Sequence, residues 1–484
     1  MQVHPKNGGI RFIIRKDNKL YNSPMKTLIC VLMIACFFSS SCQRVKSRIA
    51  LDDQREKLND VVQNEAPNPM ELILLPHPGE SKIDHEISRY QGKIRLSQNT
   101  FQSIEHLGWL YVAKARESFD PGYYKLAEQC ANCLDSEQPQ CSEGLLLRGQ
   151  VLENLHRFKG AETLARELVA KRGLSFDYGL LGDSLMEQGR LDEAADAYQK
   201  MVNIKPDLEA YARIAHYRWL KGDIAAATTL MQMAVSASSP NAPESAAWVT
   251  TRLAFYQFQN GKPDKADQSC ALALEYQKNY APALLLRGRI LLSEGKANEA
   301  VEVLTESERL NPLPDYEWVL LEALHSAGRE QEAVSVQARL DKCGPSTDPR
   351  TYSLYLSTSG RSNKTSIELA RNELSNRADV FTHDALAWAL ASNGNAEDAY
   401  KEMQKALVEG TYDGRLFFHA TVIASESGHE VEAAAWLRKA LVNPALLLPS
   451  EQKQLSQVQT LIGEAAKQKA VTESKTAALF MMEK

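Results

Sequence analysis

The sequence has no large excess of charge of one sign and no catalytic signature. Its 56 basic and 61 acidic residues leave a net charge of −5, so no positive field would attract a polyphosphate backbone and we expect no nucleic-acid partner. It contains no His-Glu-x-x-His zinc helix, no Gly-x-Ser-x-Gly elbow and no dinucleotide fingerprint. We therefore predict no catalytic residue, no bound metal and no cofactor.

The N-terminal apolar run is too short to span a membrane, because spanning needs about 20 apolar residues. Thr27 to Phe38 follows Met25-Lys26 and precedes Ser39-Ser40-Ser41-Cys42. This order resembles a bacterial lipoprotein signal, which implies a signal peptide over 25–41, a lipid on Cys42 and a position in the cell envelope facing the periplasm. Cys36 as the lipidated residue, an ordinary secretory signal and an uncleaved anchor remain alternatives. Residues 1–24 are an upstream extension if Met25 is the start.

A spacer is expected between the lipid and the folded body, over residues 42–97. Four prolines within residues 43–82 and the absence of a sustained hydrophobic period favour this interpretation. The apolar patch Met70 to Leu75 is predicted to dock either on the body or on a partner.

From about residue 98 the sequence repeats itself. A Gly followed five residues later by Ala recurs, mostly at steps of 33 or 34 residues. These pairs are Gly189/Ala194, Gly222/Ala227, Gly261/Ala266, Gly295/Ala300, Gly328/Ala333, Gly394/Ala399 and Gly428/Ala433. The Gly supplies a turn after one helix, and the Ala lets the second helix approach closely. Each unit is therefore predicted to be a helical hairpin.

The unit Gly182-Asp-Ser-Leu-Met-Glu-Gln-Gly189-Arg-Leu-Asp-Glu-Ala194, with Tyr198 and Pro206 after it, resembles the tetratricopeptide repeat. The resemblance covers about 350 of the 484 residues and implies an all-α, right-handed superhelical solenoid. We expect nine or ten repeats over 98–445, then a C-terminal capping helix and a frayed tail over 446–484. The near phosphate-loop at Gly360 to Ser366 is interpreted as a repeat turn.

Five cysteines lie in the predicted body: Cys130, Cys133, Cys141, Cys270 and Cys343. Buried free thiols, a disulfide between Cys133 and Cys141, and a zinc site that includes Cys130 and Cys133 are the alternatives for the first three. None of them implies catalysis.

The resemblance also implies a concave groove lined by the first helix of each repeat. Carried over repeat by repeat, the groove-facing positions include several aromatic residues, which are frequent at binding hot spots but also pack between repeats. The candidate partner-binding residues are His216, Trp219, Trp248, Phe255, Phe258, Arg289, Trp318, Glu322 and His325.

We therefore expect a membrane-tethered scaffold that holds a protein or peptide partner in this groove. One alternative is an enzyme whose site is assembled from His216, His325, Glu322 and Arg289. Another is a cytoplasmic adaptor with the same repeats. An open groove would favour binding, whereas a closed pocket with a perturbed His–carboxylate pair would favour catalysis.

Overall fold

The computed structural model describes residues 68–361 and 363–482. Every regular element in these ranges is helical, which confirms the prediction of an all-α repeat solenoid. The predicted signal peptide, Cys36 and Cys42 lie outside the described residues. No helix within those ranges is long and apolar enough to cross a membrane.

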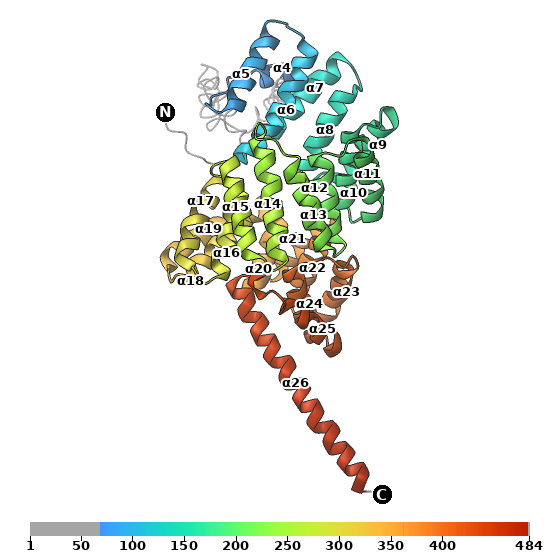
Figure 1. Cartoon of the computed structure of the whole chain (residues 1–484), viewed down its shortest axis with the longest axis vertical. Coiled ribbons are helices and arrows are strands. Elements are labelled where there is room, and N and C mark those ends of the chain that lie inside the picture. Colours follow the sequence, from blue (N-terminus) through green and yellow to red (C-terminus); the bar gives the residue numbers. More distant parts are fainter. Residues whose placement is uncertain (1–67, 362, 483–484) are drawn as a thin grey trace, which may run out of the picture. The chain divides into compact units, whose positions relative to one another are not determined.

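The chain divides into two compact units between Leu155 and His156. The described helices of the first unit are α4 (Pro69–Ile73), α5 (Lys82–Arg95), α6 (Thr100–Ser118), α7 (Gly122–Glu137) and α8 (Ser142–Asn154) (Figure 1). The second unit begins with α9 (Phe158–Lys171), α10 (Ser175–Glu187), α11 (Leu191–Ile204), α12 (Leu208–Leu220), α13 (Ile224–Ser236), α14 (Pro243–Gln259), α15 (Pro263–Tyr276), α16 (Ala281–Ser293) and α17 (Ala297–Leu310). It continues with α18 (Pro314–Ser326), α19 (Glu330–Thr347), α20 (Pro349–Ser359), α21 (Asn363–Asn376), α22 (Val380–Ala391), α23 (Ala396–Leu407), α24 (Gly414–Glu426), α25 (Glu430–Ala440), the 3₁₀ turn η2 (Pro444–Leu446) and α26 (Pro449–Met482).

Part of the expected spacer is folded in the first unit. Ile73, from the apolar patch Met70 to Leu75, is fully buried in the core of this unit. Its carbonyl oxygen accepts hydrogen bonds from Tyr111 Oη at 2.8 Å and from Gln91 Nε2 at 2.9 Å. The patch therefore docks on the chain itself, and helices α4 and α5 extend the folded body to Pro69.

Close contact inside each hairpin follows from the Gly and Ala residues that define the repeat. Ala194, Ala227, Ala266 and Ala300 are all fully buried, as expected where two helix axes approach. Gly189 and the equivalent turn glycines have positive φ, a conformation that only glycine adopts without strain. The repeats are therefore built as the sequence predicts.

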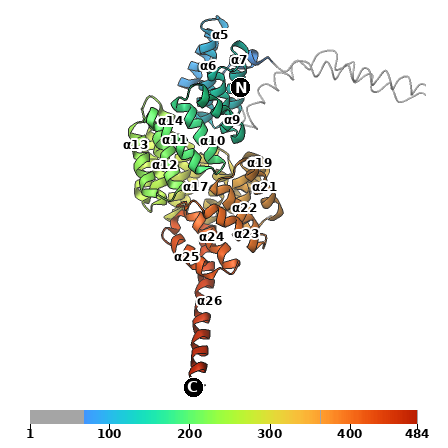
Figure 2. The same ribbon diagram turned by 90° about the vertical axis from the view of Figure 1, so that its right-hand side faces the viewer.

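The second unit closes on itself in a way that the repeat pattern does not predict. The hairpins that begin with α22 and α24 come six hairpins after those that begin with α10 and α12. The turns before α22 and α24 contact the C-terminal ends of α10 and α12, through Arg377 with Glu187 and through the Tyr412 carbonyl with Trp219. Figures 1 and 2 show α22 to α25 next to the stack that contains α10 to α16. In an open solenoid each repeat contacts only its neighbours along the chain, whereas this unit also contacts itself six hairpins later.

A series of hydrogen bonds forms this closure, and we call it the closing ladder. Its members are Trp219 Nε1 to the Tyr412 carbonyl at 2.7 Å, Thr411 Oγ1 to the Leu220 carbonyl at 2.8 Å, Gln259 Nε2 to Asp413 at 2.6 Å, Asn443 Nδ2 to the Phe258 carbonyl at 3.0 Å, Arg289 Nη2 to the Leu446 carbonyl at 3.1 Å, and Ser450 Oγ to Glu322 at 2.5 Å.

Helix α26 covers the last repeat with its first turns. Leu455 and Val458 are buried, so this part of the helix acts as the expected cap. Beyond it the described helix continues to Met482, in the region where a frayed tail was expected.

Candidate interaction surfaces

The structure divides the predicted groove residues into three groups by exposure. Trp219, Phe258 and Trp318 are buried, at 3 %, 3 % and 1 % exposure. His216, Phe255, Arg289 and Glu322 are half-buried. Trp248 is 39 % exposed, and the His325 side chain is 49 % exposed.

Trp219 lies in the middle of the closure. Its ring stacks on Phe381, at 5.3 Å between centroids, and meets the edge of Phe255 at 5.1 Å. With its indole nitrogen bonded to the Tyr412 carbonyl, it has no free polar group to offer a partner. The Trp219 ring itself is therefore covered by the chain's own later repeats.

The same holds where α16 and α18 meet the C-terminal residues. Arg415 lies over the ring of Trp318 at 4.8 Å and forms an ion pair of 2.7 Å with Glu451. Glu322 accepts hydrogen bonds from Ser450 and from Trp318 Nε1, and burial raises its pKa. Trp318 and Glu322 therefore hold α26 in place.

The four residues of the enzyme hypothesis have separate partners in the described part of the chain. His216 bonds to Arg252 and Tyr256, Arg289 to Leu446, Glu322 to Ser450, and His325 to Glu330. They do not form one constellation. A buried His–carboxylate pair does exist, His419 Nδ1 with Asp384 at 2.8 Å, but His419 is fully buried and stacked on Trp388 in the core.

Arg252 is a residue that the sequence analysis missed. It lies on α14 and is half-buried, and its Nη2 donates to His216 Nδ1 at 3.1 Å and to Tyr256 Oη at 3.3 Å. The guanidinium also lies 5.0 Å from the ring of Phe255 and 6.0 Å from that of Trp219. Burial, with Arg252 close by, lowers the pKa of His216 to about 3, so this imidazole is neutral at physiological pH.

A second group of charges joins α10 to the turn before α22. Arg377 forms an ion pair of 2.5 Å with Glu187 and one of 3.0 Å with Asp379, and Arg350 also reaches Asp379, at 2.9 Å. Each arginine here has a carboxylate partner. The group therefore reinforces the closure and leaves no free charge for a ligand.

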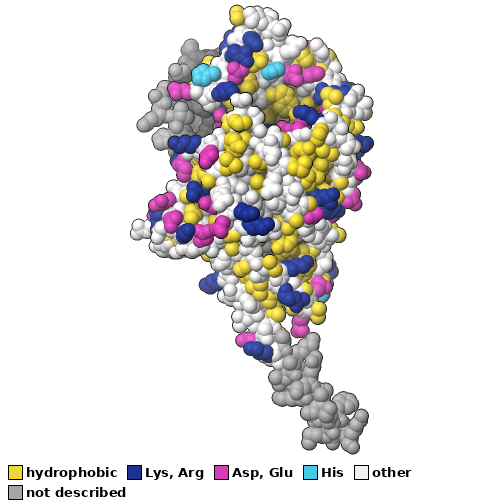
Figure 3. All heavy atoms as spheres, viewed as in Figure 1, with side chains coloured by type: hydrophobic (Ala, Val, Ile, Leu, Met, Phe, Trp, Pro, Cys, Tyr) yellow, Lys and Arg dark blue, Asp and Glu magenta, His cyan; other side chains and the backbone are white. Residues whose placement is uncertain are grey.

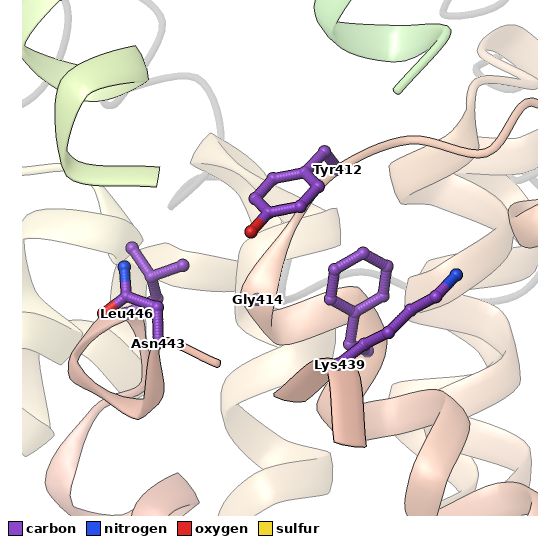
Figure 4. Close-up of a pocket in the computed structure, with 6 residues that line it drawn as sticks. Tyr412, Gly414, Lys439, Asn443 and Leu446 are labelled. Carbon is purple, nitrogen blue, oxygen red and sulfur yellow. The ribbon is translucent and has the colours of Figure 1, made fainter. Parts of the chain in front are cut away.

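A small pocket lies between the turn before α24 and the end of α25 (Figure 4). It is a shallow depression lined by Tyr412, Gly414, Phe417, Lys439, Asn443 and Leu446. The Lys439 ammonium lies over the ring of Trp436 at 4.3 Å and over that of Phe417 at 5.4 Å. Since Tyr412 and Asn443 also take part in the closing ladder, we assign the pocket to the packing of the closure.

Trp248 belongs to an apolar edge that remains open. Met233 near the end of α13 is 41 % exposed, and Leu272 near the end of α15 is 37 % exposed. Because α14 runs antiparallel to both neighbours, the first turns of α14 lie level with these two helix ends. Figure 3 shows hydrophobic side chains gathered over α14 on this face. We call Met233, Trp248 and Leu272 the apolar edge.

The five cysteines of the body are free thiols. Cys130 and Cys133 are buried on α7, and burial raises the pKa of Cys133 to about 11. Cys141 begins α8, where its sulfur accepts the Gly144 backbone N–H at 3.4 Å and is not bonded to Cys133. In the ranges that the structure describes, no group of three or more His, Cys, Asp or Glu is placed to hold a metal ion.

Comparisons with known proteins identify the repeats. The tetratricopeptide repeat family matches residues 146–209, 180–243 and 281–312. Tetratricopeptide repeats are thus present over residues 146–243 and 281–312. A comparison with curated proteins gives no match.

Solved structures of similar fold share little sequence with this chain. PilF of Pseudomonas aeruginosa is 13 % identical over 44 % of this chain and 96 % of its own, with a TM-score of 0.36. A thermophilic tetratricopeptide protein of Thermus thermophilus is 21 % identical over 38 % of this chain and 99 % of its own, with a TM-score of 0.33. The human IFIT1 dimer with PPP-AAAA is 12 % identical over 77 % of this chain and 94 % of its own, with a TM-score of 0.42.

Proposed function

We propose that this chain is a repeat scaffold that binds a protein partner and is anchored by a lipid on Cys42 in the bacterial cell envelope, facing the periplasm. The presence of tetratricopeptide repeats supports a role in protein interaction. The observation that carries the choice of surface is the apolar edge around Trp248. Large exposed apolar side chains on neighbouring helices are typical of interaction sites.

Of the predicted groove residues, the proposed site includes Trp248. Trp248 lies on the apolar edge, whereas Trp219, Phe258 and Trp318 are held by intramolecular packing. A partner that approaches the apolar edge needs no opening of the closing ladder. An aromatic anchor such as Trp248 contributes large contact area with little loss of side-chain freedom.

Cross-linking and affinity purification of the tagged protein from cells tests this surface. We expect Trp248→Ala to lose a partner that the wild type captures, because the substitution removes the exposed anchor without disturbing the core. Val431→Ala on α25 is the matched control, since Val431 is 81 % exposed but lies away from the apolar edge. Retention of the partner by folded Trp248→Ala would show that the edge is not the site.

Cell fractionation tests the anchor. Cys42→Ser should move the protein from the membrane fraction to the soluble fraction, whereas Cys36→Ser should leave it at the membrane. The reverse result would make Cys36 the lipidated residue. A protein that stays soluble in all three forms and resists external protease in cells with an opened outer membrane would instead support the cytoplasmic adaptor.

A further inference from the structure

The repeats provide their own comparison for Arg252. Arg213 stands nine residues before Gly222, and Arg252 stands nine residues before Gly261. Each arginine therefore occupies the same position of a first helix. Each arginine also donates a hydrogen bond to a residue of the preceding repeat. That residue is Asp183 for Arg213 and His216 for Arg252, and both stand six residues before the turn Gly of their repeat.

The two junctions differ in charge. Asp183 accepts from Arg213 Nε at 2.8 Å and lies 2.7 Å from its Nη2, which is the two-pronged geometry of a strong Arg–carboxylate pair. At the next junction a neutral imidazole takes the place of the carboxylate. Among the residues that the structure describes, Arg252 forms no ion pair.

The Arg252 guanidinium is half-buried beside three aromatic rings and has no counter-charge among the described residues. Its Nη2 is engaged by His216 and Tyr256, and its other N–H groups donate to no described residue. The rings of Trp219, Phe255 and Tyr256 lie 6.0, 5.0 and 5.3 Å from the guanidinium carbon and reduce its contact with water. In such surroundings an added anion is attracted more strongly than at an exposed lysine.

We propose that Arg252 binds a carboxylate of an acidic segment of the protein partner, which supplies from outside the counter-charge that Asp183 gives Arg213 within the chain. This rests on the proposed function, since it names the chemistry that the partner offers. A carboxylate fits better than a phosphate because one guanidinium balances one negative charge. The neighbouring Arg350 and Arg377 are already paired with Asp379 and Glu187, and His216 is neutral.

The experiment uses the purified full chain and two short probes, acetyl-Ala-Glu-Ala-amide and acetyl-Ala-Gln-Ala-amide. The His216 imidazole, labelled with ¹³C, reports binding because it is hydrogen-bonded to Arg252. We expect a saturable shift of the His216 signal with the Glu peptide and none with the Gln peptide. Arg252→Gln should lower the affinity for the Glu peptide at least about tenfold, as expected for loss of a charge-assisted hydrogen bond.

Two further variants keep the test decisive. Arg213→Gln is the matched control, and it should leave the His216 shift unchanged because Arg213 is already paired. His216→Asp should place a carboxylate beside Arg252 inside the chain, raise the thermal unfolding midpoint and abolish peptide binding, which is then followed by calorimetry.

Three results would overturn the proposal: equal response to both peptides, unchanged affinity in Arg252→Gln, or a stronger response to inorganic phosphate than to the Glu peptide. This outcome is independent of the capture experiment. Loss of capture by Trp248→Ala with no peptide binding refutes the carboxylate site alone, and peptide binding without any captured partner refutes the scaffold alone.

Discussion

Trp219 and Trp248 are two tryptophans that the sequence assigns to one groove but that have different surroundings. Trp219 is 3 % exposed, stacks on Phe381 and donates to the Tyr412 carbonyl. We expect Trp219→Ala to lower the free energy of unfolding by about 3–5 kcal/mol, because it removes a large buried ring and leaves a carbonyl without its donor.

Urea unfolding measures this cost, and Trp248→Ala is its control. With 39 % of its surface exposed, Trp248 should contribute clearly less to the free energy of unfolding than the fully packed Trp219. Similar losses in both variants would mean that Trp219 is not held by the closure.

At the same scale, Glu317 is expected to make the free energy of unfolding depend on pH. It is 2 % exposed and one of its carboxylate oxygens has no hydrogen-bond partner, and burial, with Glu308 nearby, raises its pKa to about 7. The folded chain therefore binds this proton more tightly than the unfolded chain, so stability is lost as the pH rises from about 4.5 to about 7. Glu317→Gln should raise the free energy of unfolding by about 1–3 kcal/mol at pH 8 and change it little at pH 4.

Thermal unfolding at the two pH values tests this. The exposed Glu332 serves for comparison, and Glu332→Gln should show no such dependence on pH. An equal gain for Glu317→Gln at pH 4 and pH 8 would rule out ionisation as the cause.

At the scale of single elements, substitutions of the turn glycines distinguish the backbone strain of a repeat turn from the contacts made by the closure. Gly222 and Gly328 occupy the same repeat position, with φ of +80° and +70°. A Cβ at Gly222 would meet the Gly410 carbonyl oxygen at 2.5 Å, whereas at Gly328 it would meet nothing within 4 Å. Gly328→Ala should cost about 1 kcal/mol from backbone strain, and Gly222→Ala should cost clearly more.

Chemical denaturation of the two alanine variants measures the difference. It isolates the contact between the turn after α12 and the turn before α24, because the backbone strain is common to both. Equal costs would mean that these turns separate in solution.

The sequence predicts the hairpins well because their cause is local. A turn glycine, a buried alanine and an apolar stripe act within about 34 residues, so their pattern is visible without any long-range information. The groove surface is different. Whether Trp219 faces a partner or Phe381 depends on a segment more than 160 residues away in the sequence. The repeat pattern describes contacts within and between adjacent repeats, so it does not predict this one.

The candidate site was therefore predicted only in part. Trp248 was predicted from its repeat position. Its exposed apolar neighbours Met233 and Leu272 lie on the second helices of their repeats, which are outside the predicted groove. Arg252 could have been found, since its spacing to Gly261 equals that of Arg213 to Gly222. Its lack of a carboxylate partner becomes visible only when both junctions are compared in space.

At the scale of the second unit, the closure changes how stability is distributed. In an open solenoid each repeat contacts only its neighbours, so removal of the last repeats leaves distant ones unaffected. Here the closing ladder joins Trp219, Phe258 and Arg289 to residues 411–446. The early repeats are therefore expected to depend on the late ones.

A chain that ends at Arg377 tests this dependence. It keeps α12 and α14 with all their neighbouring repeats but loses α22 to α26 and the whole ladder. We expect backbone amides of α12 and α14 to exchange with solvent at least about tenfold faster in the shortened chain, because loss of about 1.4 kcal/mol of protection suffices for that factor. A chain ending at residue 468, which keeps the ladder, should match the full chain. If exchange in α12 and α14 were the same in both, the second unit would behave as an open array, and the Trp219 side chain itself would be free to contact a partner.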